Sequence, residues 1–498
     1  MTWEIKKEAE QTSYQAVHTF DVSAQTEQIK IQYTLKQVSW LRFLVFDDKG
    51  ILRAQKSGIA STGSVSILDT DSVQRTDIEE IEDLSFQLGD LNTLPGTIHE
   101  GQWRIEYKLN ISDKQEIEDI LGEIDIEYLT GEQVGTAPNQ RPYEVSWKKE
   151  GATVFELDEA VLERTLETTA RWYKGDFHTH TVFSDGKMTR EQNLEQAVKQ
   201  GLDFFVATDH DLMPTSWPLS FNCLVLPGVE VTSDLGHYNR LFGLTHPFQD
   251  KGYQVLDEEV DLVSSFNKTD EEQHLNSVNH PFLTEWKWLA KSLPISAIDS
   301  LEIWNDPTYE ANIEATERAL KTWDRLLQDG HKITGIGGSD SHLMPVETYP
   351  NSSLPSLIGD PATYVFSEAL NGKQLKSGVA EGKVFVSRFN YEIDLTVNGG
   401  TIGDHFADWK EEVSASCMIH SPSHSTDIQI EWTIDGSVVT TTRQKEDTQV
   451  FLLDSSQYHY VRVTVRSSKG ELLAFSNPVF FGEKEPELLT WKDVVESV

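Results

Sequence analysis

The sequence contains closely spaced histidine and acidic residues of the types that bind transition metals. His178 and His180 form a His-x-His pair, and Asp185 follows five residues after His180. Asp340 and His342 have the same spacing of two. Because residues two apart in a strand point to the same side, each pair is able to hold one ion. Asp340 and His342 would instead serve neighbouring ions if their strand ends before them. Imidazole and carboxylate ligands without cysteine suit zinc, iron or manganese.

Four more candidate ligands lie next to short apolar runs in the same segment. His210 follows Ala-Thr-Asp, Glu230 follows Pro-Gly-Val, and His237 and His280 flank two later runs. A carboxylate such as that of Glu230 is able to bridge two ions. The candidate metal ligands are therefore His178, His180, Asp185, His210, Glu230, His237, His280, Asp340 and His342.

The apolar runs that carry these residues alternate with helical patterns. Seven runs are predicted to be strands, at 176–180, 204–210, 224–231, 238–244, 275–280, 300–304 and 333–340. Helices are predicted at 188–200, where Thr189 and Gln192 have capping-box spacing, and at 309–329. This alternation indicates a parallel sheet or a barrel one unit short of eight. Because the carboxyl ends of barrel strands share one rim, the candidate ligands are expected to converge there.

The two flanking segments have the period-two alternation of antiparallel strands. The N-terminal segment alternates from about residue 14 to residue 147, for example at Trp103, Ile105, Tyr107 and Leu109. The last segment alternates again and contains an Asp435-Gly436 pair typical of a hairpin turn. We therefore predict a multidomain chain with a β-sandwich at 1–170, a barrel at 171–388 and an immunoglobulin-like β-sandwich at 389–498.

The composition excludes several classes of protein. The chain has 42 basic and 81 acidic residues, a net charge of −39, which disfavours binding to nucleic-acid polymers and anionic lipid. A metal cluster reverses the sign of the potential locally, so a small, anionic substrate is still compatible with this charge. Two cysteines, Cys223 and Cys417, provide neither a disulfide scaffold nor a thiolate zinc site. No apolar run has the length of a signal peptide or membrane span, so a cytoplasmic protein with no membrane partner is expected. The oligomeric state is not predicted.

The middle segment resembles the polymerase-and-histidinol-phosphatase (PHP) family of metal-dependent hydrolases. The resemblance covers about 215 residues and rests on five motifs in family order. They are Asp-Phe-His-Thr-His-Thr with Ser-Asp-Gly, Ala-Thr-Asp-His, Pro-Gly-Val-Glu, Asn-His-Pro and Gly-Ser-Asp-Ser-His. Trp-Tyr-Lys-Gly at 172–175 and Gly-His-Tyr-Asn at 236–239 look most like the carbaryl-hydrolase-like branch, whose members often carry an N-terminal β-domain.

The resemblance implies a distorted (β/α)7 barrel that holds two or three ions of zinc, iron or manganese. Carried over by motif, the first ion would be bound by His178, His180, Glu230 and Asp340. The second would share Glu230 and add His237 and His280, and the third would use Asp185, His210 and His342. Asp185 stands where some family members have histidine. Glu230, Asp340 and His342 are the expected catalytic residues.

His246 competes with His237 for the place of ligand at the fourth predicted strand. His246 follows the strand's end at Leu244, where barrel geometry would place a ligand, whereas His237 precedes the strand. His237 is preferred because its motif matches the family and because Pro247 indicates an extended turn at His246.

Other polar residues near the motifs have expected structural roles. Asp209 is expected to orient a neighbour, and Asp211 either supports the ligands or faces solvent. His274 and His331 are expected at the surface.

The resemblance implies hydrolysis by a hydroxide that bridges two metal ions. The leading hypothesis is a phosphoesterase for small phosphomonoesters or phosphodiesters. The alternatives are a hydrolase of carboxyl esters, amides or carbamates, and a non-catalytic metal-binding PHP protein. Lys174, Arg240 and Arg388 would be able to contact a substrate anion, although each is expected to be an ordinary surface or structural residue.

Overall fold

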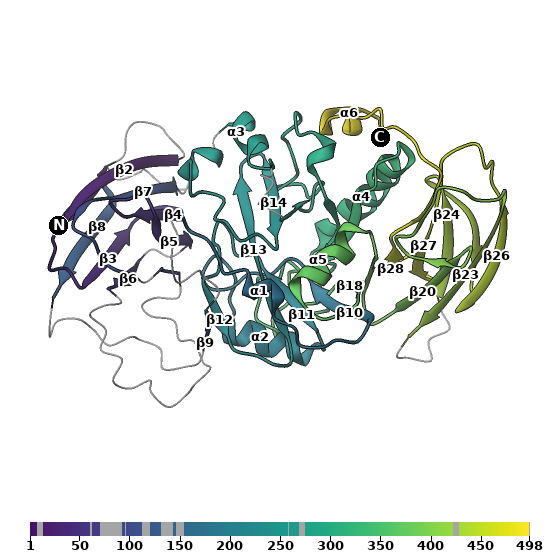
Figure 1. The fold of residues 1–498 in the computed structure, drawn as a ribbon, viewed down its shortest axis with the longest axis horizontal. Coiled ribbons are helices and arrows are strands. Elements are labelled where there is room, and N and C mark those ends of the chain that lie inside the picture. The colour runs from purple at the N-terminus through teal and green to yellow at the C-terminus, as the bar shows by residue number, and fades with distance from the viewer. Residues whose placement is uncertain are drawn as a thin grey trace.

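The computed structural model is rich in β-strands and has few helices. It describes residues 1–6, 13–59, 62–69, 92–94, 96–111, 120–130, 143–145, 154–256, 258–267, 274–421 and 428–497. In this part of the chain, no helix is both long enough and apolar enough to cross a membrane. Two β-rich parts lie at opposite ends of the molecule, with residues 160–388 between them (Figure 1).

The N-terminal part consists of two antiparallel four-stranded sheets. One contains β1 (Thr2–Lys6), β8 (Ile120–Leu129), β3 (Gln28–Leu35) and β6 (Thr62–Leu68), in that spatial order. The other contains β2 (Ser13–Val22), β7 (Gly101–Ile111), β4 (Val38–Phe46) and β5 (Leu52–Gly58). On β7, Trp103, Ile105, Tyr107 and Leu109 are all buried, which confirms the predicted alternation. Their side chains belong to one apolar core with those of the first sheet.

The central part has a strand at six of the seven predicted runs, whereas the first strand, β10 (Arg171–Asp176), ends where the first predicted run begins. The other six are, in chain order, β11 (Phe204–Ala207), β13 (Leu224–Ser233), β14 (Gly236–Leu241), β15 (Leu275–Val278), β16 (Ser300–Asn305) and β17 (Thr334–Gly338). Neighbouring strands are parallel except β14, which is antiparallel to both β13 and β15. Only two residues separate β13 from β14, too few for the crossover connection that a parallel pair needs. The expectation of an all-parallel sheet is therefore wrong at β14.

The hydrogen-bonded ladder of the described residues does not confirm the predicted (β/α)7 barrel. The free side of β10 pairs with β18 (Ala362–Ser367), which pairs in turn with β19 (Val384–Ser387). Beyond their ends, β10 and β17 meet in an isolated parallel bridge between Thr179 and Ser341. Asp340 N also donates a hydrogen bond of 2.8 Å to His178 O. The loops after the two strands are therefore adjacent, although a closed barrel is not confirmed.

Helices cover this sheet unevenly. The two predicted helices are present as α2 (Arg190–Lys199), with the predicted capping box at Thr189, and α4 (Glu310–Gln328). The described residues of this part also form α1 (Ala160–Glu163), α3 (Glu259–Ser264), α5 (Gly372–Ala380) and the 3-10 turns η2 (Gly252–Leu256) and η3 (Ile295–Ala297). A short strand, β12 (Ser216–Pro218), stands between β11 and β13 and pairs with β9 (Tyr143–Val145). The strand–helix alternation is therefore incomplete.

The C-terminal part is a β-sandwich whose second sheet continues the central sheet. The first sheet contains β21 (Gly400–Thr401), β20 (Glu392–Val397), β23 (Glu412–His420) and β26 (Glu446–Leu452). The second contains β28 (Leu472–Ser476), β27 (His459–Ser467), β24 (Ile428–Ile434), β25 (Ser437–Thr442), β29 (Val479–Phe481) and β22 (His405–Phe406). Because β28 pairs with β19, the two parts share one ladder.

Two details of the C-terminal part bear on the predictions. Asp435 and Gly436 have positive φ angles of 49° and 79° in the turn between β24 and β25, which confirms the predicted hairpin. The last helix, α6 (Trp491–Ser497), lies near α4, and its buried Trp491 and Val494 belong to the same apolar core as α4 (Figure 1). The boundaries proposed at 170 and 388 stay predictions.

Candidate metal centre

The structure brings all nine candidate ligands together at one end of the central sheet. Their ligand atoms form four overlapping groups, in each of which the atoms lie within 4.8 Å of one another. The groups are His180, Asp185, His210 and His342; His178, Glu230 and His280; His178, His180 and Asp340; and His210, Glu230 and His237. The convergence expected from the strand ends is therefore present.

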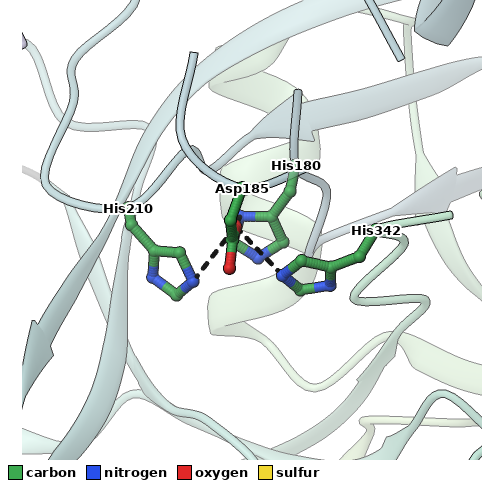
Figure 2. Close-up of side chains that lie close together, drawn as sticks. All are labelled: His180, Asp185, His210 and His342. Carbon is green, nitrogen blue, oxygen red and sulfur yellow. Dashed lines mark ion pairs between the residues drawn. The ribbon is translucent and has the colours of Figure 1, made fainter. Parts of the chain in front are cut away.

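The first group surrounds the carboxylate of Asp185 (Figure 2). Its Oδ1 atom lies 3.1 Å from His342 Nε2, 3.6 Å from His210 Nε2 and 3.8 Å from His180 Nδ1. The Nδ1 atom of His342 lies 2.7 Å from the backbone oxygen of Asp340. A protonated Nδ1 donates to that oxygen, which directs Nε2 toward Asp185 and makes Nε2 the nitrogen available to a metal once its own proton is lost.

Glu230 lies at the centre of the other groups. Its Oε1 atom is 3.2 Å from His178 Nε2, 3.2 Å from His237 Nδ1 and 3.5 Å from His280 Nε2. Its Oε2 atom is 2.8 Å from His210 Nδ1. The Glu230 side chain is fully buried, so these imidazoles replace the water that would otherwise solvate its charge.

The His-x-His pair behaves as its spacing predicts. His178 Nε2 and His180 Nε2 lie 3.3 and 2.9 Å from Asp340 Oδ1, so both rings reach the same carboxylate. Asp340 and His342 belong to different groups, which matches the alternative in which this second pair serves neighbouring sites. Asp340 and His280 have positive φ angles of 48° and 27°, an uncommon backbone conformation that occurs at functional sites.

Mutual charge interactions shift the pKa values of these groups. Burial alone would lower the pKa of His180, but Asp340 and Glu230 outweigh it and raise that pKa to about 10. Burial would raise the pKa of Glu230, but His178 and other histidines hold it well below its usual value. Burial dominates at His237 and lowers its pKa to about 4. The carboxylates are therefore ionised at neutral pH, and His237 is neutral.

Unpaired ligand atoms show that this set of residues fits metal ions. Five buried atoms of the cluster make no hydrogen bond of regular geometry: His178 Nε2, His180 Nε2, Asp185 Oδ1, Glu230 Oε2 and His280 Nδ1. The close contacts of the first four are with other members of the cluster. Buried polar atoms without hydrogen bonds are costly unless another partner satisfies them. Imidazole nitrogen and carboxylate oxygen are ligands for divalent transition metals, so ions would supply such partners.

The direction of β14 explains how His237 reaches the cluster. Because β14 runs antiparallel to its neighbours, its first residues lie at the same end of the sheet as the last residues of β13. His237 therefore reaches Glu230, whereas His246 lies beyond the other end of β14. His246 Nε2 is 2.8 Å from Gln55 Oε1, and His246 Nδ1 accepts a hydrogen bond of 3.2 Å from Phe248 N. Both nitrogens of His246 are thus engaged away from the cluster.

A second layer of polar residues, which the sequence analysis missed, orients the candidate ligands. Glu302 Oε1 lies 2.9 Å from His178 Nδ1, and Glu302 Oε2 accepts a hydrogen bond of 2.7 Å from His280 N. Asn279 donates to Glu230 Oε1 and Asn305 donates to Asp340 Oδ2. An acidic residue within the apolar run Ser-Leu-Glu-Ile-Trp was the available signal for Glu302, because a buried charge needs partners.

Two aspartates beside His210 also have structural roles. Asp209 accepts hydrogen bonds from Thr181 N, Thr181 Oγ1 and Ser184 Oγ, each 2.7 Å long, so it orients the loop after β10 as expected. Asp211 is buried and pairs with Arg42 of β4, so it does not face solvent. Asp211 also accepts from Thr232 N, and Thr232 Oγ1 lies 2.5 Å from His210 Nδ1.

The structure corrects the expected location of one histidine. His274 is 2% exposed, and its Nδ1 atom lies 3.2 Å from Arg240 Nη2. The surface location expected for His274 is therefore wrong. The side chain of His331 is 11% exposed and its Nε2 lies 2.8 Å from Leu488 O, so it is not freely exposed either. A lone histidine in a polar stretch carries no local sign of the residues that cover it, so the sequence does not reveal the burial of either ring.

The three basic residues considered as anion contacts have structural partners. Lys174 donates to Gln200 O and Asn390 Oδ1, and Arg388 makes two hydrogen bonds of 2.7 Å with Asp360. Arg240 is buried beside His274. None of the three lines the pocket over the cluster.

A pocket of about 640 Å³ opens over the cluster. Its described lining includes four aromatic side chains, those of Trp40, Trp286, Tyr309 and Tyr349. It also includes six carboxylates, those of Asp185, Glu230, Asp234, Glu285, Asp306 and Asp340. Apart from histidines, the one basic side chain in this described lining is Arg42, which is paired with Asp211.

Comparisons with known proteins gave structural likenesses only. No protein-family model and no curated protein matches the chain. A two-domain protein from Bacteroides vulgatus that contains a predicted PHP-like metal-dependent phosphoesterase is 16% identical, with a TM-score of 0.35, over 62% of this chain and 95% of that protein. A candidate metal-dependent phosphoesterase from Bifidobacterium adolescentis is 17% identical, with a TM-score of 0.23, over 37% of this chain and 91% of that protein. At these values the likenesses do not define the activity of this chain.

Proposed function

We propose that this protein is a metal-dependent hydrolase of the PHP type that acts on small phosphomonoesters or phosphodiesters. The observation that carries the proposal is the convergence of nine imidazole and carboxylate side chains under one pocket, with Glu230 in contact with several of them. The five sequence motifs support the same reading. The finer resemblance to the carbaryl-hydrolase-like branch rests on two short motifs and stays a prediction.

The proposed ligand sets are those that the motifs imply; the first and third match groups that the side chains form, and the second draws on two groups that share Glu230. One ion would be held by His178, His180 and Asp340, with Glu230 beside them. A second would share Glu230 and use His237 and His280.

A third ion would use Asp185, His210 and His342, whose ligand atoms group with that of His180. Two or three ions of zinc, iron or manganese would therefore occupy the site.

The proposed chemistry divides between the ions and the chain. Bound divalent ions would supply Lewis acidity that makes water nucleophilic near neutral pH and stabilises negative charge on substrate oxygen. Glu230 and Asp340 would hold the ions at the floor of the pocket and offset part of their positive charge. Glu302 would hold the ring of His178 in place through Nδ1, and the backbone oxygen of Asp340 would do the same for His342.

The charge of the pocket supports a second candidate function. The described lining carries six carboxylates but no unpaired lysine or arginine, because Arg42 pairs with Asp211. A phosphate would therefore rely on the ions alone for neutralisation, whereas an uncharged carboxyl ester, amide or carbamate needs no such partner. Among the alternatives to a phosphoesterase, the charge of the pocket therefore favours a hydrolase of carboxyl esters, amides or carbamates.

Hydrolysis of matched chromogenic esters tests these proposals. The metal-loaded protein is assayed with p-nitrophenyl phosphate, bis-p-nitrophenyl phosphate and p-nitrophenyl acetate, alongside Glu230→Gln. We expect turnover of a phosphoester by the wild type and none by the variant. Turnover of the acetate alone would favour the second candidate. No turnover of any of the three by a protein that retains its metal would support a non-catalytic metal-binding role.

A further inference from the structure

One strand of the N-terminal sandwich enters the pocket over the cluster. Trp40 and Arg42 lie two apart on β4, so their side chains point to the same face, and both line the pocket. The centroid of the Trp40 ring lies 5.3 Å from that of His210, and the ring planes are at 81°. The N-terminal part therefore supplies a wall of the site whose candidate ligands all come from the central part.

Several contacts hold the Trp40 ring in this position. Its Nε1 donates a hydrogen bond of 3.0 Å to Ser57 Oγ on the neighbouring strand β5. The Arg42 guanidinium lies 5.4 Å from the ring centroid, and Arg42 is itself held by the buried Asp211. The Trp40 side chain is half-buried, and its one polar atom, Nε1, already has a hydrogen-bond partner within the sandwich. The ring is thus placed before any substrate binds, and part of its surface stays accessible in the pocket.

The rest of the pocket suits an uncharged ring. Trp286 is 43% exposed and lines the same pocket, as do Tyr309 and Tyr349, whose ring centroids are 5.1 Å apart. Asp234 and Glu285 are exposed lining residues with carboxylates that would repel an anionic group away from the cluster. Accessible aromatic faces are favourable partners for flat rings.

We propose that Trp40 is a specificity-determining residue that binds an uncharged ring of the substrate, aromatic or sugar, while the scissile group lies over the cluster. The position of the scissile group rests on the proposed function, but recognition of the ring by Trp40 does not require turnover. The substrate class is therefore a small ester with an uncharged ring, aromatic or sugar, next to the bond that is cleaved.

Binding of two non-hydrolysable probes separates ring recognition from catalysis. Calorimetry compares phenylphosphonate with methylphosphonate on the metal-loaded wild type, Trp40→Ala, Trp40→Phe and Trp3→Ala. Trp3 is a matched control, because it is a half-buried tryptophan of the same sandwich that stacks on His18 and does not line the pocket. We expect the wild type to prefer the phenyl probe by about tenfold. Trp40→Ala should lose most of that preference, whereas Trp40→Phe and Trp3→Ala should keep it.

Two results would overturn the proposal. One is a Trp40→Ala variant that prefers phenylphosphonate over methylphosphonate as strongly as the wild type does. The other is a wild type that binds the two probes with equal affinity. Failure of the proposed function would look different: the chromogenic esters would not be cleaved, yet the dependence of phenyl binding on Trp40 would persist. A cyclohexylphosphonate arm distinguishes an aromatic ring from a saturated, sugar-like ring.

Discussion

Glu302 and His178 form a buried carboxylate–imidazole contact of 2.9 Å, on the side of the imidazole opposite to the cluster. The carboxylate keeps a proton on Nδ1 and leaves Nε2 directed toward Glu230 and Asp340. Glu302 also accepts a hydrogen bond from the backbone of His280, so it supports two candidate ligands at once.

Glu302→Gln should weaken metal binding by about 10- to 100-fold without unfolding the chain. The amide cannot accept hydrogen bonds with both terminal atoms, so either His178 or His280 loses its partner. Competition with a calibrated chelator measures the affinity. Glu314→Gln, at an exposed position on α4, is the matched control and should bind metal as the wild type does. Equal affinities in all three proteins would contradict the orienting role.

The purified wild type should contain two or three transition-metal ions per chain. Glu230→Gln should reduce that number and lower turnover by more than the roughly 100-fold typical of an outer-shell change, because the central charge of the cluster is lost. Elemental analysis and ester hydrolysis measure the two effects. His420→Gln, an exposed position on β23, should change neither. Less than one ion per chain in metal-replete wild type would refute the cluster.

His237→Ala should lose an ion, whereas His246→Ala should keep the full metal content. His237 reaches Glu230, but both ring nitrogens of His246 contact protein groups elsewhere. His246→Ala should instead lower the free energy of unfolding by about 1–3 kcal/mol, because Gln55 loses a buried partner. Elemental analysis and urea denaturation distinguish the two variants. Metal loss from His246→Ala alone would show that the ligand assignment is wrong.

Arg42→Met should destabilise the protein by about 3–5 kcal/mol, because it leaves the charge of Asp211 buried and unpaired. Asp211→Asn combined with Arg42→Met should recover part of this loss, because the buried charge is then removed. Urea denaturation of the wild type, the two single variants and the double variant forms a cycle that isolates the pair. If the double variant loses as much free energy of unfolding as the two single variants together, Arg42 and Asp211 are not coupled.

Metal uptake at pH 7 should release protons. The pKa of His180 is raised to about 10 and that of His178 is raised well above its usual value, so these two rings carry protons that compete with a metal. The pKa values of His280 and His342 are shifted in the same direction. His237, with a pKa near 4, should contribute no proton. The apparent affinity should therefore increase as the pH rises from 7 toward 10. Calorimetry in buffers of different ionisation enthalpy counts the protons, and uptake without release would contradict the predicted charge states.

The sequence by itself determined which residues form the candidate site, because short motifs at strand ends are local features. His178 and His180 are two apart, so a single extended stretch is enough to direct both toward one carboxylate. The helix cap at Thr189 and the turn at Asp435 were predictable for the same reason, since each depends on residues within one or two turns of chain.

Only the tertiary structure decided which distant elements meet. The reversed direction of β14 brings the start of that strand, and with it His237, to the end of the sheet where the other ligands lie. Trp40 and Glu302 reach the site from elements whose local patterns are those of ordinary strands. Their roles depend on packing between segments far apart in sequence, and strand periodicity indicates that a face is buried without indicating what buries it.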